Sequence, residues 1–130
     1  MNYPDIFGNR FLFEQIHSCK WNEKTTISKW FTLTKIKTEL SDWSGGKDFN
    51  LIYYDAFPPN VQPELWTGEV FDQLYGMLAP GGALVTYSSK GDVRRAMMTA
   101  GFHVEKLKGP LGKREMIRAI MNRRTRSREF

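Results

Sequence analysis

Cysteine is nearly absent from this sequence, since Cys19 stands alone among 130 residues. A single cysteine excludes an internal disulfide and a zinc site built from several cysteines. His17 lies two positions before it and would point to a different side of a helix, so we expect no metal site. Apolar runs of the ~18–20 residues that cross a membrane are also absent, as is the apolar core of a signal peptide. We therefore expect a cytoplasmic protein without a membrane partner.

The composition indicates one folded domain with an excess of basic residues. Hydrophobic residues make up 41% of the chain and aromatic residues 14%, which is typical of a folded protein. Nineteen lysines and arginines against fourteen acidic residues give a net charge of +5, which favours an anionic partner such as RNA. We expect one domain over residues 1–121 and a basic, disordered tail over residues 122–130.

Hydrophobic spacing predicts alternating helices and strands. Helical spacing covers residues 3–19 and, most clearly, residues 64–78, where a Pro-Gly-Gly turn at residues 79–82 should end the helix. Another helix should run from Asp92, a plausible N-cap, to Gly101, and residues 21–29 form a polar connector. Strands are expected at residues 31–37, 49–54, 83–88, 102–107 and 115–120. This order indicates an α/β fold with a mainly parallel sheet and a C-terminal antiparallel hairpin.

Asp55 follows the most apolar of these strands and precedes the proline pair Pro58-Pro59. The prolines prevent further strand pairing and stiffen the loop. An acid at the carboxyl end of a parallel strand lies where open α/β sheets bind ligands, which makes Asp55 a candidate site residue. Position alone leaves a second interpretation open, in which Asp55 caps a turn.

Several motifs together resemble a known family. The stretch Leu78-Ala79-Pro80-Gly81-Gly82 resembles the turn before the fifth strand of S-adenosylmethionine-dependent methyltransferases. Residues 49–119 further resemble the tRNA methyltransferases that complete 5-methylaminomethyl-2-thiouridine at the wobble position, alone or fused to a flavin-dependent oxidase. The motifs that carry this resemblance, in order, are Asp55-Ala56-Phe57-Pro58-Pro59, Pro63-Glu64-Leu65-Trp66-Thr67, Val93-Arg94-Arg95, Ala100-Gly101-Phe102 and Gly112-Lys113-Arg114-Glu115-Met116.

The resemblance implies transfer of a methyl group from S-adenosylmethionine to the primary amine of 5-aminomethyl-2-thiouridine in tRNA. Asp55 would then orient the amine and stabilise the positive charge that develops on its nitrogen. Phe57 and Pro58 would shape the base pocket, with Phe57 stacked on the uracil ring, and both Asp55 and Phe57 are candidate catalytic residues. Packing of Phe57 beneath its own loop is the alternative.

The resemblance also implies binding residues for the cofactor and for tRNA. Glu39 falls where the third strand of many such enzymes ends in an acid that holds the adenine, and Asp55 and Ala56 would also contact the cofactor. Lys113 and Arg114 on the terminal hairpin would hold tRNA phosphates. In the alternative interpretation, Glu39 is a solvated glutamate at a strand end, and Lys113 and Arg114 belong to a solvated hairpin.

One part of the family pattern is absent. The glycine-rich loop after the first strand and the acid after the second strand have no counterpart here, because Gly8 stands alone before Phe31. We therefore expect a partial Rossmann-like methyltransferase fold, the C-terminal portion of the domain, lacking the first two strands. A catalytically silent RNA-binding or scaffold fragment, or a methyltransferase for another substrate, are the alternatives.

The missing strands lead to a prediction about the sheet edge. The family's strand order is third, second, first, fourth, fifth, seventh, sixth, so the fourth strand, residues 49–54, would lose one neighbour. Because an apolar unpaired strand tends to pair, we expect residues 31–37 or a second copy of the chain to cover this edge. The second case would be a homodimer.

Overall fold

The computed structural model describes residues 10–43, 45–108 and 115–121. The chain divides into two compact units, Met1–Trp43 and Ser44–Phe130. The predicted tail at residues 122–130 lies outside the described residues. Across the described ranges, no helix has the length and apolar character needed to cross a membrane.

The first unit contains a helix and a β-hairpin. It comprises α2 (Arg10–Ser18), β1 (Lys24–Ser28), β2 (Phe31–Thr34) and the 3-10 helix η1 (Leu40–Asp42). The strands β1 and β2 are antiparallel, with Thr26 opposite Thr32. The prediction of a connector at residues 21–29 was therefore wrong. The segment Thr25-Thr26-Ile27 is β-branched, which favours an extended chain, and Ile27 is buried while its neighbours stay exposed or half-buried.

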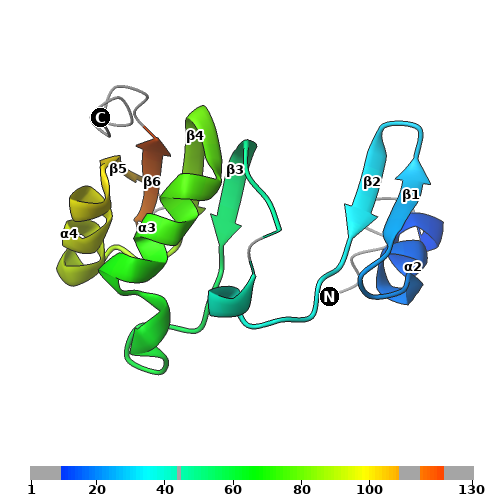
Figure 1. Ribbon diagram of the computed structural model, residues 1–130, viewed down its shortest axis with the longest axis horizontal. Coiled ribbons are helices and arrows are strands. Elements are labelled where there is room, and N and C mark those ends of the chain that lie inside the picture. Colours follow the sequence, from blue (N-terminus) through cyan, green and yellow to red (C-terminus); the bar gives the residue numbers. More distant parts are fainter. Residues whose placement is uncertain (1–9, 44, 109–114, 122–130) are drawn as a thin grey trace. The chain divides into compact units, whose positions relative to one another are not determined.

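The second unit is built on a four-stranded sheet (Figure 1). Its strands are β3 (Phe49–Tyr54), β4 (Leu78–Thr86), β5 (Phe102–Leu107) and β6 (Met116–Met121), in the order β3-β4-β6-β5. The strands β3 and β4 pair in parallel, whereas β6 is antiparallel to both β4 and β5. This is the expected fourth, fifth, seventh, sixth order, and it confirms the α/β fold with its C-terminal antiparallel hairpin.

The strand β4 begins earlier than predicted. The helix before it ends at Met77 and Leu78 already belongs to the strand, so the expected turn at residues 79–82 lies inside β4. The pairing shifts register there, since Phe49 lies opposite Leu78 but Leu51 lies opposite Ala83. A Cβ at Gly82 would come within 2.9 Å of the Phe49 carbonyl oxygen, so glycine permits this close approach of the two strands.

Two helices, α3 (Gly68–Met77) and α4 (Gly91–Ala100), lie against one face of the sheet (Figure 1). Both carry buried side chains. The fully buried side chains of this core are Phe71, Leu74, Leu84, Val93, Met97 and Ile117. The single helix predicted over residues 64–78 is instead a 3-10 helix, η2 (Pro63–Leu65), followed by α3. Thr67 separates them because its hydroxyl accepts a hydrogen bond from the Val70 N–H and caps α3. At α4 the N-cap is Lys90, and Asp92 lies in the first turn instead.

The opposite face of β3 is open. Leu51 and Tyr53 point there and are 59% and 66% exposed. No described strand pairs with the outer edge of β3, which lies at the end of the sheet order. The prediction that residues 31–37 cover this edge was wrong, because Phe31–Thr34 pairs with β1 in the first unit.

Candidate functional site

The candidate site lies at the carboxyl ends of β3 and β4. These strands are parallel neighbours, with Tyr54 opposite Thr86, so Asp55 and Tyr87 both emerge at the same edge of the sheet. Asp55 is exposed, and its carboxylate makes no hydrogen bond or ion pair with any residue that the structure describes. The carboxylate is therefore available to a ligand.

Three aromatic side chains hold the loop that carries Asp55, and we call Tyr54, Trp66 and Tyr87 the aromatic clamp. The Tyr87 hydroxyl donates to the Ala56 carbonyl oxygen at 2.7 Å, and the Trp66 indole N–H donates to the Phe57 carbonyl oxygen at 2.8 Å. The Tyr54 hydroxyl donates to a third carbonyl, that of Leu65, at 2.5 Å. Hydrogen bonds at both ends of the loop fix its backbone and so position the neighbouring carboxylate.

The clamp residues also pack against one another. The Trp66 ring meets Tyr54 and Tyr87 edge-on, with ring centroids 5.1 Å and 6.0 Å apart, and Trp66 is only 6% exposed. Burial raises the pKa of Tyr54 to about 12, so this hydroxyl remains a neutral donor at physiological pH. Trp66 therefore anchors the start of α3 to the sheet and also holds the loop.

A pocket of about 370 Å³ lies beside this loop, lined by residues 58–60 and 87–90. Pro58, a predicted substrate-binding residue, contributes to its wall. Phe57 does not line this pocket, and its side chain is 69% exposed rather than packed beneath the loop. The ring is thus free to meet a planar ligand outside the pocket.

Three predicted site residues are not among those at this strand end. Glu39 is exposed at the N-cap of η1 in the first unit, and its side chain makes no capping hydrogen bond. Its adenine contact stays a prediction. Lys113 and Arg114 fall outside the described residues.

The histidine and cysteine near the end of α2 have ordinary partners. The Cys19 thiol donates to the Ile16 carbonyl oxygen at 3.4 Å, and a His17 ring nitrogen lies 2.9 Å from the Phe13 carbonyl oxygen. Among the described residues, no group of three or more potential ligands is placed to hold a metal ion.

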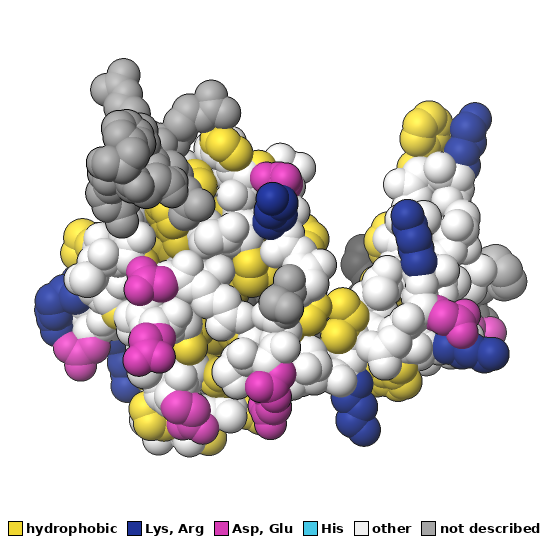
Figure 2. All heavy atoms as spheres, in the orientation of Figure 1, with side chains coloured by type: hydrophobic (Ala, Val, Ile, Leu, Met, Phe, Trp, Pro, Cys, Tyr) yellow, Lys and Arg dark blue, Asp and Glu magenta, His cyan; other side chains and the backbone are white. Residues whose placement is uncertain are grey.

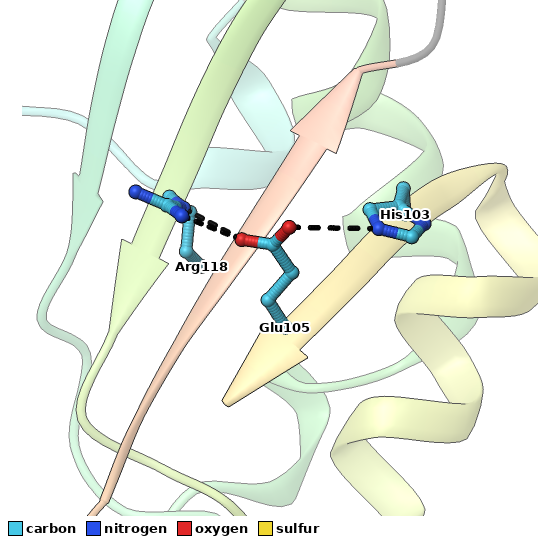
Figure 3. Close-up of polar contacts among 3 residues, drawn as sticks. All are labelled: His103, Glu105 and Arg118. Atoms are coloured by element: carbon cyan, nitrogen blue, oxygen red, sulfur yellow. Dashed lines mark hydrogen bonds and ion pairs between the residues drawn. The ribbon is translucent and has the colours of Figure 1, made fainter. Parts of the chain in front are cut away.

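A polar trio lies on β5 and β6 (Figure 3), with Arg118 opposite Val85 of β4. Arg118 donates two hydrogen bonds to one Glu105 oxygen, at 2.9 Å and 2.6 Å, and the His103 ring lies 3.6 Å from the other oxygen. The Arg118 hydrogen bonds hold the pKa of Glu105 below its usual value. Glu105 and Arg118 are opposite each other in the β5–β6 pairing, so the trio is a cross-strand contact that stabilises the hairpin.

Sequence reasoning missed the clamp tyrosines and Ser88. Tyr54 and Tyr87 stand at the ends of two predicted strands, which was a usable signal, but their partners are backbone carbonyls that only the folded loop brings into reach. Ser88 is 6% exposed and lines the pocket, although nothing in its sequence neighbourhood marks it.

Comparison with known proteins agrees with this fold. A sequence model of a family of S-adenosyl-L-methionine-dependent methyltransferases matches residues 6–122. The structure is similar to that of MnmC2 from Aquifex aeolicus, with a TM-score of 0.71 and 24% identity over 93% of this chain. It is also similar to a provisionally assigned O-methyltransferase from Nostoc punctiforme, with a TM-score of 0.56 and 14% identity over 67% of this chain. The chain spans 38% and 36% of the lengths of these two proteins.

Proposed function

Because the chain belongs to a family of S-adenosyl-L-methionine-dependent methyltransferases, we propose that it methylates the aminomethyl nitrogen of 5-aminomethyl-2-thiouridine at the tRNA wobble position. The observation that carries this proposal is the unpaired Asp55 carboxylate on a loop held by the aromatic clamp. The fold of MnmC2, which the chain shares over 93% of its residues, supports it.

The chemistry requires a neutral amine held in a fixed direction. When bound, S-adenosylmethionine would supply an electrophilic methyl group, whose bond to sulfur breaks so that S-adenosylhomocysteine leaves. As the nitrogen lone pair forms the new N–C bond, positive charge develops on the nitrogen. Asp55 accepts a hydrogen bond from the amine, which orients the lone pair, and its negative charge stabilises the charge that develops.

The neighbouring side chains suit a modified base. Phe57 presents an exposed ring beside Asp55, and an aromatic face can stack on a base that has left its helix. Pro58 closes one wall of the adjoining pocket and excludes water from that side. A rigid backbone under both residues keeps the ring and the carboxylate in a constant relation.

The same strand end partly fits the cofactor. A carboxylate has two oxygens, so Asp55 can bind the substrate amine through one and a hydroxyl or ammonium group of S-adenosylmethionine through the other. We propose that Ala56 contacts the cofactor beside it. Asp55 makes no competing contact with the described residues, which is what this arrangement requires.

Features of the β1–β2 hairpin support RNA as the partner. Residues 20–37 contain five lysines and one acidic residue, Glu23. Figure 2 shows hydrophobic and basic side chains together at the tip of this hairpin. Trp30 is 88% exposed, with the Lys29 ammonium 5.2 Å from its ring centre. An exposed indole beside a cation suits stacking on an unpaired base next to a phosphate. Lys113 and Arg114 would add phosphate contacts.

Methyl transfer to tRNA carrying 5-aminomethyl-2-thiouridine tests the proposal, with tRNA lacking the aminomethyl group as the negative substrate. Asp55→Asn should slow single-turnover transfer by about 10²–10³, because it removes one positioned charge. Asp48→Asn is the matched control, since Asp48 is an exposed acid before β3 with a φ of 64° that asparagine also tolerates. An Asp55→Asn rate within about a factor of two of wild type would remove the proposed role.

A titration with S-adenosylhomocysteine separates this proposal from a catalytically silent RNA-binding fragment. Only the enzyme should bind this reaction product saturably. Binding of tRNA without saturable binding of S-adenosylhomocysteine would favour the silent fragment. Saturable binding with transfer to some other acceptor would favour a different substrate.

We further propose that the outer edge of β3 pairs with a second copy of the chain. An edge strand presents unpaired backbone donors and acceptors, and here it also carries the exposed side chains of Leu51 and Tyr53. Pairing of two identical edges would bury both features in a closed, two-fold symmetric contact.

A further inference from the structure

The wall of the pocket beside the Asp55 loop ends at the start of α4. Ser88, Ser89 and Lys90 form the pocket wall that leads into this helix, which begins at Gly91. The first N–H groups of any α-helix have no partner within the helix. Here the N-cap residue, Lys90, makes no side-chain capping hydrogen bond, so these donors remain uncapped. A ten-residue helix also directs the positive end of its dipole towards the pocket.

The charges around this turn favour an anion. Lys90 is exposed at the pocket wall. The single acid in the turn, Asp92, is paired with Arg95, so its charge is neutralised. The Arg95 guanidinium also folds back over the helix start, since a Cβ on Gly91 would lie 3.2 Å from one of its nitrogens.

Ser88 provides a second, independent observation. Only 6% of its surface is exposed, and it lines the pocket. Its hydroxyl makes no hydrogen bond with any described residue. The Ser88 oxygen is not among the polar atoms that are sealed from solvent without a partner, so the hydroxyl opens into the pocket and can meet water or a ligand there. An oxyanion in the pocket would accept hydrogen bonds from the Ser88 hydroxyl and from the helix N–H groups together.

We propose that the pocket between residues 58–60 and the start of α4 is a phosphate-binding subsite. Its donors are the Ser88 and Ser89 hydroxyls, the Lys90 ammonium and the N–H groups of residues 91–93. The pocket adjoins the loop that carries Asp55. When RNA is the substrate, the anion bound in the pocket is therefore the phosphodiester next to the nucleoside that Asp55 holds. This last assignment rests on the proposed function, whereas the anion site itself does not.

Amide chemical shifts of the full chain, titrated with inorganic phosphate, test the site. The amides of Gly91, Asp92 and Val93 should shift saturably. Ser88→Ala and Lys90→Gln should each weaken binding by about tenfold, because each removes a donor to a charged acceptor. Lys47→Gln is the matched control, since Lys47 is exposed before β3, at the amino-terminal end of that strand. Shifts that stay linear, or that are equal in all variants, would overturn the site.

A second titration with short single-stranded RNA lacking terminal phosphates identifies the source of the phosphate. Saturable shifts of the same three amides, again weakened in Ser88→Ala, support the phosphodiester. Saturation by inorganic phosphate alone overturns the RNA assignment and supports a site for a free phosphate. The proposed function is tested separately from both titrations. If the chain does not bind S-adenosylhomocysteine, the proposed function fails, but the amide shifts caused by phosphate or RNA are still observed.

Discussion

The aromatic clamp predicts a specific effect for Tyr87→Phe. The substitution keeps the ring that packs edge-on against Trp66 and removes only the hydroxyl that donates to Ala56 at 2.7 Å. A neutral hydrogen bond of this kind contributes about 0.5–1.5 kcal/mol net. For a chain of this size, ~1 kcal/mol lowers Tm by roughly 4 °C.

Hydrogen exchange in the loop should report the lost hydrogen bond more directly than Tm does. Val61 and Gln62 both donate their N–H groups to the Pro58 carbonyl oxygen, at 2.8 Å and 2.9 Å, inside the segment that the clamp holds. A loss of ~1 kcal/mol corresponds to about a fivefold larger opening equilibrium. Hydrogen exchange at these two amides should therefore accelerate about fivefold in Tyr87→Phe when exchange follows local opening.

Tyr53→Phe is the matched control for this prediction. It deletes the same hydroxyl from an adjacent strand, but Tyr53 is exposed and its hydroxyl makes no hydrogen bond with the described residues. Its stability should stay within ~0.5 kcal/mol of wild type. Equal effects of the two substitutions on both stability and exchange would refute the idea that the Tyr87 hydroxyl fixes the loop.

Three other features give testable outcomes. Because Arg118 holds the pKa of Glu105 below its ordinary value of 4.5, ionised Glu105 stabilises the native state above that pH. The Tm of wild type should exceed that of Glu105→Gln by the largest amount near pH ~7, and this difference should shrink as pH falls below 4.5 through the lowered pKa. A Tm difference that stays constant with pH would contradict this. Trp30→Ala should weaken RNA binding by ~1–3 kcal/mol without changing its salt dependence. A variant that binds RNA as tightly as wild type in fluorescence anisotropy titrations would refute the stacking role. Leu51→Lys should convert a sedimenting dimer to a monomer, and a monomeric wild type at all concentrations would remove the paired-edge proposal.

The sheet strands were predictable where their signal was local. The apolar run of β3 identifies a strand without reference to other segments. The strand β1 was not found because its threonines look polar, and only Ile27 reaches the core of its unit. The prediction therefore failed where one buried residue decides the conformation.

The early start of β4 and the clamp could not be predicted, because both depend on distant segments. A Pro-Gly-Gly sequence usually indicates a turn, but here the Phe49 carbonyl approaches Gly82 and extends the pairing of β3 with β4. Asp55 was identifiable from its place after a buried strand. Its support by Tyr87 was not, because a contact across 31 residues requires the parallel pairing to exist first.

The position of β6 has a consequence for how the second unit folds during synthesis. β6 is the last described strand to leave the ribosome, yet it lies between β4 and β5 and pairs with both. Until residues 116–121 emerge, β5 has no neighbour in the sheet, and one edge of β4 stays exposed to other chains. The unit therefore closes late, through contacts distant in sequence, which slows folding and makes nascent chains vulnerable to misassembly. A chain released before Met116 should expose the apolar face that β6 covers and be recognised by chaperones.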